Sequence, residues 1–482
     1  MKVIIAGAGG TGCFAALLLA RAGHEVTVLE RDRLRVRQDV ETAAVAAFRA
    51  AAPQIVQPHI IMARARELLL QRLPDVYRGL LDAGVQEAPL HTQMPPSLPD
   101  KDPRPGDDRL TQLLSRRSTI DLVLLRAVVA EPGVTLRPGV KVTGLLTAPA
   151  AKGNRADPAP PHVVGVATDQ GDLHADITID ATGRRSAIDD WLTAIGAART
   201  DLKHAECGLA YYSRHYRIRE GAALPGSPLQ RMVMALDEFM VGLWPADNGA
   251  VQLGVVPLAA DHRFRAARDP AVFTRVLNSV PAYKAWLDVL DPITGVFPMA
   301  GLHNTLRRLV IDQVPAATGL HAIGDTVCTT NPTLSRGLAL ALTGAADLVD
   351  VLDKHPDDPR CRALALDDLV TGHVEPFYVE QALVDGARLE QMRHLIFGDP
   401  APEPQQADSG RVSYAEVRAA MPFDPVAFRG FWKVMGMMAT PEEVYTDPEV
   451  VARTRAVLAA RGGAAPTTVQ PSREELAAAL AG

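Results

Sequence analysis

Cysteine is scarce in this sequence. Its 482 residues contain four cysteines, Cys13, Cys207, Cys328 and Cys361, which lie far apart and never form a closely spaced pair. Close pairs are typical of zinc sites and redox dithiols, and a dense cysteine framework is typical of small secreted proteins. We therefore expect no metal site and no disulfides, and a reduced chain in the cytoplasm.

Positive charge and long apolar runs are also missing. The 50 Lys and Arg residues are fewer than the 56 Asp and Glu residues, and the net charge is −6. A nucleic-acid surface needs a basic excess, and a membrane-spanning helix needs about 20 apolar residues in a row. We expect neither a nucleic-acid partner nor a membrane span. With 47% hydrophobic and 22% charged residues, the chain is globular in composition and long enough for about three domains.

A glycine loop, Gly7-Ala8-Gly9-Gly10-Thr11-Gly12, separates an apolar strand at 2–6 from an apolar helix at 13–22. A second strand follows at 25–30, which completes the βαβ pattern of a dinucleotide-binding unit. Gly10 and Thr11 lie in the loop just before the helix, and the free amides and dipole of a helix start favour phosphate. The pattern predicts a bound dinucleotide.

Each conserved position of this loop type has a physical role. Gly7 permits the tight turn, Gly9 lets the backbone approach a pyrophosphate, and Gly12 lets the helix pack closely on the strand. Glu30 ends the second strand, where its carboxylate can accept hydrogen bonds from both hydroxyls of an adenosine ribose. An acid there disfavours a 2′-phosphate, so NADP fits poorly; Arg31, the next residue, belongs to the same predicted site.

Two later segments favour FAD over NAD as the dinucleotide. Residues 176–186 form a strand that ends in a small-residue turn at Gly183, and residues 319–325 form a strand that ends in Gly324-Asp325. An Asp in that place can hold ribityl hydroxyls. Pro332 follows, and a helix begins near Gly337, where its amides can face the flavin ring.

With these segments in this order, the chain resembles the flavin-dependent monooxygenases built on the para-hydroxybenzoate hydroxylase fold. Among them it is most similar to bacterial FAD-dependent oxidoreductases that include polyether epoxidases, over roughly residues 1 to 350. The resemblance depends on the following segments: the glycine loop with Glu30, Gln57-Pro58-His59 with Arg64-Ala65-Arg66-Glu67-Leu68, Arg117-Ser118-Thr119-Ile120-Asp121, Asp180-Ala181-Thr182-Gly183, Tyr211-Tyr212-Ser213-Arg214, and Gly324-Asp325 with Pro332. The family usually reads Pro-x-x-Gly-x-Gly here, whereas this chain has Ser335 at the first glycine.

The resemblance implies an α/β fold in which a Rossmann-like FAD-binding domain of the glutathione reductase type is interrupted by a mixed β-sheet substrate domain. A helical C-terminal extension follows. The expected boundaries are 1–90, 108–205 and 300–400 for the FAD-binding domain, 206–299 with part of 91–107 for the substrate domain, and 401–482 for the extension.

The resemblance also implies the chemistry of a monooxygenase in secondary metabolism. NAD(P)H, as a transient reductant, or a partner flavin reductase would reduce FAD, and O₂ would form a C4a-hydroperoxide that oxygenates a small organic substrate by epoxidation or hydroxylation. The family allows a homodimer. Two alternatives remain open: an FAD-dependent reductase or dehydrogenase without oxygen insertion, and a flavoprotein whose FAD is structural, as in a non-redox cyclase or a ligand-binding protein.

Further residues are assigned through the resemblance. Arg117 would contact FAD, and Gly183 is a better cofactor neighbour than Asp180. Along the strand at 208–218, two-residue alternation places Tyr212, Arg214 and Tyr216 on one face. That face either lines a substrate pocket or packs in the sheet. His59 is expected to be structural. The Met and aromatic run from Phe428 to Met438 is expected to be core packing, with a substrate-covering or dimer face as the alternative.

Absent motifs narrow the class further. There is no second GxGxxG, which disfavours two-dinucleotide reductases and typical Baeyer–Villiger enzymes and predicts that a nicotinamide binds only weakly and briefly. There is also no Trp-x-Trp-x-Ile-Pro segment, which disfavours a tryptophan-type halogenase.

Overall fold

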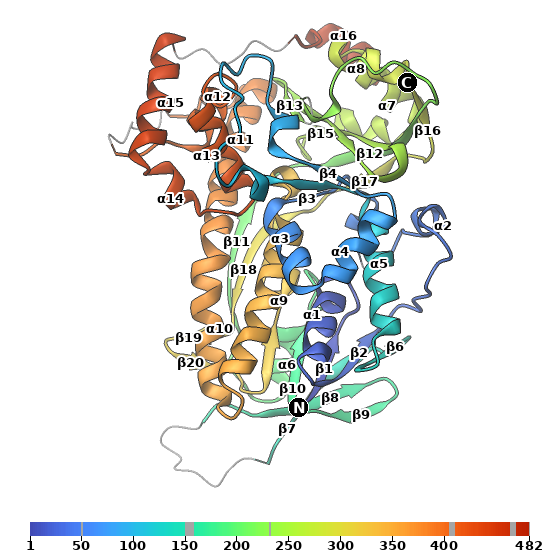
Figure 1. Ribbon diagram of the computed structural model, residues 1–482, viewed down its shortest axis with the longest axis vertical. Coiled ribbons are helices and arrows are strands. Elements are labelled where there is room, and N and C mark those ends of the chain that lie inside the picture. Colours follow the sequence, from blue (N-terminus) through green and yellow to red (C-terminus); the bar gives the residue numbers. More distant parts are fainter. Residues whose placement is uncertain (50–51, 150–158, 231–232, 404–409, 463–468, 482) are drawn as a thin grey trace.

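The structure is a computed structural model that describes residues 1–49, 52–149, 159–230, 233–403, 410–462 and 469–481. Figure 1 shows two layers of structure along the long axis, with a parallel sheet and its helices below and a second sheet above. The central parts of two predicted loops, 148–162 and 399–410, lie outside the described residues. Within those residues, no helix combines the length and the apolar character that crossing a membrane requires.

The lower layer is a five-stranded parallel sheet in the order β21-β10-β1-β2-β6. Its strands β1, β10 and β21 are mostly apolar and almost fully buried, as Val3-Ile4-Ile5 illustrates, whereas the edge strand β6 is partly exposed. Beside it, helix α1 packs against both α5 and α9 (Figure 1). The bounds are β1 Lys2–Ala6, β2 Glu25–Glu30, β6 Val134–Pro138, β10 Ile177–Asp180, β21 Leu320–Ala322, α1 Gly10–Arg21, α5 Arg117–Ala130 and α9 Gly337–Lys354.

A small antiparallel sheet lies at the lower end of the molecule (Figure 1). It contains β7 Val142–Thr147, β8 Val163–Thr168 and β9 Gly171–His174. The predicted strand at 176–186 is β10, which is buried throughout and joins the parallel sheet between β1 and β21. This connection places the turn after β10 beside the glycine loop.

The upper layer is a six-stranded sheet in the order β13-β14-β15-β12-β16, with β17 also paired to β12. One face is closed by α7, α8 and α16, and Tyr216, Leu253, Phe273 and Trp286 belong to the core between them. The bounds are β12 Tyr211–Ile218, β13 Val233–Ala235, β14 Phe239–Pro245, β15 Ala250–Pro257, β16 Leu290–Pro292, β17 Phe297–Met299, α7 Pro270–Asn278, α8 Pro281–Leu287 and α16 Arg473–Leu480.

Smaller elements connect the two layers. One sheet has the order β3-β5-β4, another has the order β11-β18-β22, and the long helix α11 packs on β11 and β18. The bounds are α2 Val40–Val45, β3 Ile60–Ile61, α3 Ala63–Arg72, α4 Pro74–Asp82, β4 Gln86–Ala88, β5 Gln112–Leu114, α6 Ile188–Ala194, β11 Asp201–Glu206, β18 His303–Arg308, β19 Val310–Ile311, β20 Val314–Pro315, β22 Cys328–Thr329, α10 Pro359–His373 and α11 Glu375–Phe397.

The C-terminal region is helical, as predicted, but its last helix separates from the others. Helices α12 Tyr414–Ala420, α13 Pro425–Met435, α14 Pro441–Tyr445 and α15 Pro448–Ala460 pack together, whereas α16 packs on α7 of the upper sheet. Phe428, Phe431, Trp432 and Met435 are buried in the main core. This confirms core packing as the role of the Met and aromatic run.

Candidate FAD site

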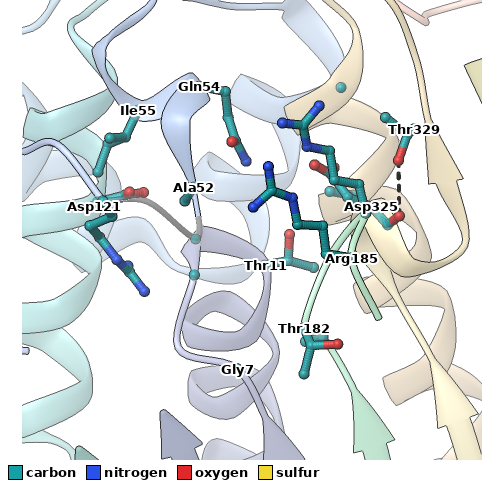
Figure 2. A pocket seen from close by; sticks show the side chains of 18 of the residues that line it. Gly7, Thr11, Ala52, Gln54, Ile55, Asp121, Thr182, Arg185, Asp325 and Thr329 are labelled. Atoms are coloured by element: carbon teal, nitrogen blue, oxygen red, sulfur yellow. Dashed lines mark hydrogen bonds between the residues drawn. The ribbon is translucent and has the colours of Figure 1, made fainter. Parts of the chain in front are cut away.

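A cavity of about 300 Å³ opens where β1, β10 and β21 end and where α1 and α9 begin. The carboxyl ends of parallel strands are the usual ligand site of an open α/β sheet. Figure 2 shows the side chains of Thr11, Arg185 and Asp325 grouped on one side of this cavity, with Asp121 on the other. Eleven predicted cofactor residues line it: Gly7, Gly9, Gly10, Thr11, Glu30, Arg31, Arg117, Gly183, Asp325, Pro332 and Gly337.

The glycines of the loop differ in what surrounds them. Gly7 has φ +107°, and a side chain there would lie 2.5 Å from the carbonyl oxygen of Ala181 at the end of β10. A side chain at Gly12 would collide with the carbonyl oxygen of Gly7, so Gly12 serves helix packing and does not line the cavity. At Gly9 no atom of the described residues beyond its chain neighbours lies within 4 Å of the Cβ position. That free space is part of the cavity, as expected if a pyrophosphate passes there.

Glu30 is held at the end of β2 by the loop that it faces. Its carboxylate accepts hydrogen bonds from the amides of Ala8 at 3.0 Å and Asp32 at 2.9 Å. The Arg49 guanidinium lies 3.1 Å from the same carboxylate and also donates to Asp32. Sequence reasoning missed Arg49, because nothing local connects residue 49 with the strand end at residue 30.

Arg117 begins helix α5 and reaches the glycine loop. Its Nε donates to Asp121 at 2.7 Å, and its guanidinium occupies the space beside Gly10, 2.8 Å from that residue's Cβ position. Burial opposes the charge of Arg117, but the carboxylate of Asp121 outweighs it and raises the pKa of the guanidinium. Arg117 is therefore a fixed cation at the start of α1, as its predicted contact with FAD requires.

Further cations line the cavity. Lys141, Arg184 and Arg185 line it together with Arg31 and Arg49. Only Arg31 and Arg117 were expected from the sequence. The sequence did contain a signal for Arg184 and Arg185, since they directly follow Gly183. A turn after a parallel strand faces the ligand edge of the sheet, so cations in that turn could have been assigned to the site. Such a group of cations suits a pyrophosphate.

Asp325 follows β21 and lines the middle of the cavity. Burial raises the pKa of its carboxyl group, while the charges of Arg117 and Arg184 act in the opposite direction. Its backbone oxygen accepts a hydrogen bond from Thr329 at 3.0 Å (Figure 2). Gly324, with φ +65°, does not line the cavity; a side chain there would press on Thr11.

The turn after β10 separates the roles of Asp180 and Gly183. The Asp180 carboxylate is fully buried and accepts hydrogen bonds from the amide and hydroxyl of Thr182 and from Ser186. It anchors the turn and does not line the cavity. Gly183 lines the cavity, and its amide donates to the Thr326 hydroxyl at 3.0 Å.

The start of α9 forms the far end of the cavity. Pro332, Ser335 and Gly337 line it, and no atom lies within 4 Å of the Cβ position of Gly337. Ser335 has φ +55°, a left-handed conformation that glycine adopts more easily. Ser335 thus has a backbone conformation that glycine, the usual residue of the resembled family at this position, adopts without strain.

A second, smaller cavity adjoins the first beneath the six-stranded sheet. Five residues line both cavities: Gln57, Pro58, Met299, Pro332 and Ser335. The sheet contributes Tyr211, Ser213, Met240, Trp244 and Val256 to its wall.

The structure bears on the two alternatives for the predicted face of β12, a pocket lining or packing in the sheet. Tyr212 lines the second cavity, but Arg214 and Tyr216 are absent from the described lining of both cavities. Tyr216 is buried in the core against α7 and α8, and the Arg214 guanidinium lies over its ring. The opposite face, with Tyr211 and Ser213, turns toward the cavity because the helices cover the first face.

His59 lies beside the FAD cavity as a structural side chain. Its Nδ1 lies 2.9 Å from the Gln57 carbonyl oxygen. Burial and the neighbouring charge of Arg117 lower the pKa of His59 to about 4, so that it is neutral near pH 7. This agrees with the structural role expected from the sequence.

Comparisons with known proteins agree with this geometry. Residues 2–85 match the family model of FAD dependent oxidoreductases. The chain is 24% identical to Protein Rv3254 of Mycobacterium tuberculosis over 375 residues, which are 72% of this chain and 71% of that protein.

Two solved structures have a similar fold. The flavin-dependent brominase Bmp2 matches with a TM-score of 0.59 and 16% identity, over 96% of this chain and 99% of its own. PqsL of Pseudomonas aeruginosa in complex with 2-aminobenzoylacetate matches with a TM-score of 0.57 and 15% identity, over 83% of this chain and 100% of its own. At such identities the similarity establishes the fold alone.

The family match and the structural matches cover different parts of the chain. The family match identifies the βαβ unit that carries the glycine loop and Glu30. The structural matches extend the fold over both sheets and confirm the predicted α/β class with its Rossmann-like FAD domain. The chain is therefore similar to FAD dependent oxidoreductases over residues 2–85 and has a fold similar to that of flavin-dependent enzymes, in agreement with the resemblance and the predicted FAD.

Proposed function

We propose that the protein is an FAD-dependent monooxygenase that inserts one oxygen atom, by way of a flavin C4a-hydroperoxide, into a small organic substrate bound in the second cavity. The observation that carries the proposal is the shared wall of the two cavities. Pro332, Ser335 and Met299 line both, so a substrate in the second cavity would lie next to the ring end of the FAD site.

The residues of the first cavity suit FAD from end to end. Glu30 would hold the adenosine ribose, and the start of α1 with Arg117 would hold the pyrophosphate. Asp325 would accept from ribityl hydroxyls, and the start of α9 at Gly337 would face the flavin ring. The free space at Gly9 and Gly337 supports this assignment, because a side chain in either place would occupy the ligand's volume.

The two cavities also suggest how the chain divides into domains. We assign 1–90, 108–205 and 300–400 to FAD binding, 206–299 with part of 91–107 to the substrate, and 401–482 to the extension. The parallel sheet and α9 fall within the first set of ranges, and the six-stranded sheet falls within the second. Helix α16 is an exception in its contacts, since it supports the sheet of the substrate domain.

The second cavity supports oxygenation by the cofactor rather than by side chains. No Asp, Glu, His, Lys or Arg is found among its described lining residues, so the residues there have no strong acid or base to offer. FAD supplies the redox and oxygen-transfer chemistry when bound. The chain's own residues position the substrate and exclude water. The similarity to the brominase Bmp2 concerns the fold alone. The sequence also lacks the Trp-x-Trp-x-Ile-Pro segment of tryptophan-type halogenases, which disfavours that activity.

The deciding experiment mixes the reduced FAD enzyme with O₂ in a stopped-flow spectrometer. We expect the absorbance of an oxygen adduct before the oxidised flavin returns, and ¹⁸O from ¹⁸O₂ in the product. NAD(P)H, bound briefly, or a flavin reductase would be the electron source. Anaerobic turnover without an adduct would instead identify a reductase or dehydrogenase. Activity that persists with a redox-inactive flavin analogue would identify a structural FAD.

A further inference from the structure

Charge is distributed unequally between the two adjoining cavities. The first is lined by Arg31, Arg49, Arg117, Arg184 and Arg185. The described lining of the second is uncharged and consists mainly of Val, Met, Pro and aromatic side chains. Burying a carboxylate without a cationic partner costs several kcal/mol, of the order of the whole binding energy of a small ligand. An anionic ligand is therefore excluded from the second cavity on energetic grounds.

Three polar side chains of the second cavity, Ser213, Gln57 and Tyr211, are already engaged with the protein. The Ser213 hydroxyl donates to Gln57 Oε1 at 2.8 Å, and Gln57 Nε2 donates to the Phe297 carbonyl oxygen at 3.2 Å. The Tyr211 hydroxyl donates to Asn331, whose own amide donates to the buried Asp385 at 2.8 Å. These protons are not free to bind a ligand, so the wall they form is chemically close to a neutral surface.

Trp244, on the sheet side of the cavity, lies close against the backbone of the sheet. Gly242 and Gly254 are cross-strand partners on β14 and β15, and Ser213 on β12 continues the same row. The six-membered ring of Trp244 lies over both glycines, in the space where their side chains would stand. Two neighbouring glycines weaken a sheet, because glycine has a low β-propensity and no side chain that could pack. Here they let an indole ring lie close to the backbone and form part of the cavity wall.

From these observations we infer that the substrate is a neutral, largely hydrocarbon molecule with a ring or conjugated system that packs on Trp244, and that Trp244 determines this specificity. The inference rests on the proposed function in that it takes the second cavity as the substrate site. A ring beside an indole gains area burial and about 0.5–1.5 kcal/mol of aromatic interaction, whereas a carboxylate finds no partner.

The test uses the oxidised FAD enzyme, without turnover, and a matched pair of ligands. The compounds 1-naphthol and 1-naphthoate share a ring system but differ in charge at pH 7. Binding is followed by the perturbation of the flavin absorbance spectrum. We expect 1-naphthol to bind at least about tenfold more tightly than 1-naphthoate, a difference of about 1.4 kcal/mol. Equal binding, tighter binding of 1-naphthoate, or binding of neither compound would overturn the inference.

Variants then test the role of Trp244. Trp244→Ala should weaken 1-naphthol binding about tenfold or more, and Trp244→Phe, which keeps a ring, should weaken it less. Gly242→Ala should also weaken binding, because the added methyl group displaces the indole without removing it. Gly372→Ala on α10, where the added methyl group meets no atom within 4 Å, is the control. Unchanged binding in both Trp244 variants, at full FAD content, would refute the role.

The outcome separates this inference from the proposed function. If the neutral ligand is preferred but no ¹⁸O-labelled product forms with any substrate, the monooxygenase proposal fails while the specificity stands. If an anionic substrate is oxygenated efficiently, the monooxygenase proposal stands and the specificity fails.

Discussion

Gly9→Val should abolish tight FAD binding while leaving the fold of the apoprotein nearly intact. Gly9 precedes α1 with φ −76°, a conformation open to any residue, and its Cβ position has free space within 4 Å. The Cβ of the valine therefore meets no atom of the described residues beyond its chain neighbours, and its methyl groups extend into the open cavity. It is a poor N-cap, so we expect the free energy of unfolding to fall by no more than about 1 kcal/mol.

In the FAD complex the same side chain would stand in the path of the pyrophosphate. Moving the phosphates away from the start of α1 loses at least one charge-assisted hydrogen bond, worth about 1.5–3 kcal/mol. The Kd for FAD should therefore rise by about 10- to 150-fold. Fluorescence quenching of FAD on titration measures the Kd, and urea unfolding of the apoprotein measures the stability.

Two other glycines provide the comparison. Gly295→Val also meets no atom within 4 Å, but it lies away from the cavity, and FAD binding should not change. Gly12→Ala would collide with the Gly7 carbonyl oxygen and should cost about 1–3 kcal/mol of stability through overpacking. Parental FAD affinity in a folded Gly9→Val protein would refute our placement of the pyrophosphate. A large loss of apoprotein stability would refute the free space beside Gly9.

Three further predictions address other parts of the FAD site and the fold. Gly337→Val should expel FAD or lower the flavin reduction potential by about 10–20 mV, because the start of α9 no longer approaches the anionic reduced ring. The potential is measured by dye titration. The control is Gly344→Val, further along α9 and also in open space, which should leave the potential unchanged. Asp325→Ala should weaken FAD binding by about tenfold or more, with Asp325→Asn in between, and full FAD retention on a desalting column would contradict its ribityl role. Burial lowers the pKa of His321 to about 3, so its contribution to stability is present above pH 6.5 and is lost as the pH falls toward 3; in His321→Leu, the loss of unfolding free energy between pH 7 and pH 5 should be smaller by about 2 kcal/mol.

Local order along the chain was enough to predict many of the residues that line the first cavity. The glycine loop between two apolar strands and a helix has a conformation that depends on adjacent residues, so the roles of Gly7, Gly9 and Gly12 could be distinguished in advance. The strands that end at Gly183 and Asp325 could be placed at the same sheet edge, because parallel strands share their carboxyl ends. The α/β class and the helical C-terminal region followed from periodicity and the resemblance.

Contacts between distant segments were beyond such reasoning. Arg49 meets Glu30 only after the chain following α2 folds back over β2. Helix α16 packs on α7 of the upper sheet, away from the other C-terminal helices. Its own sequence does not indicate which surface it will contact. Neither contact has a local pattern, because their partners are selected by packing.

The face of β12 illustrates the division most clearly. Two-residue alternation along 208–218 separated Tyr212, Arg214 and Tyr216 from Tyr211, Ser213 and His215 without error, since successive side chains of a strand point to opposite sides. The sequence by itself therefore determined which residues share a face. Only the tertiary structure decided how each face meets the cavity, because Tyr212 and Tyr216 pack in the core with α7 and α8, although Tyr212 also reaches the second cavity, whereas Tyr211 and Ser213 lie beside Trp244 in the lining of that cavity.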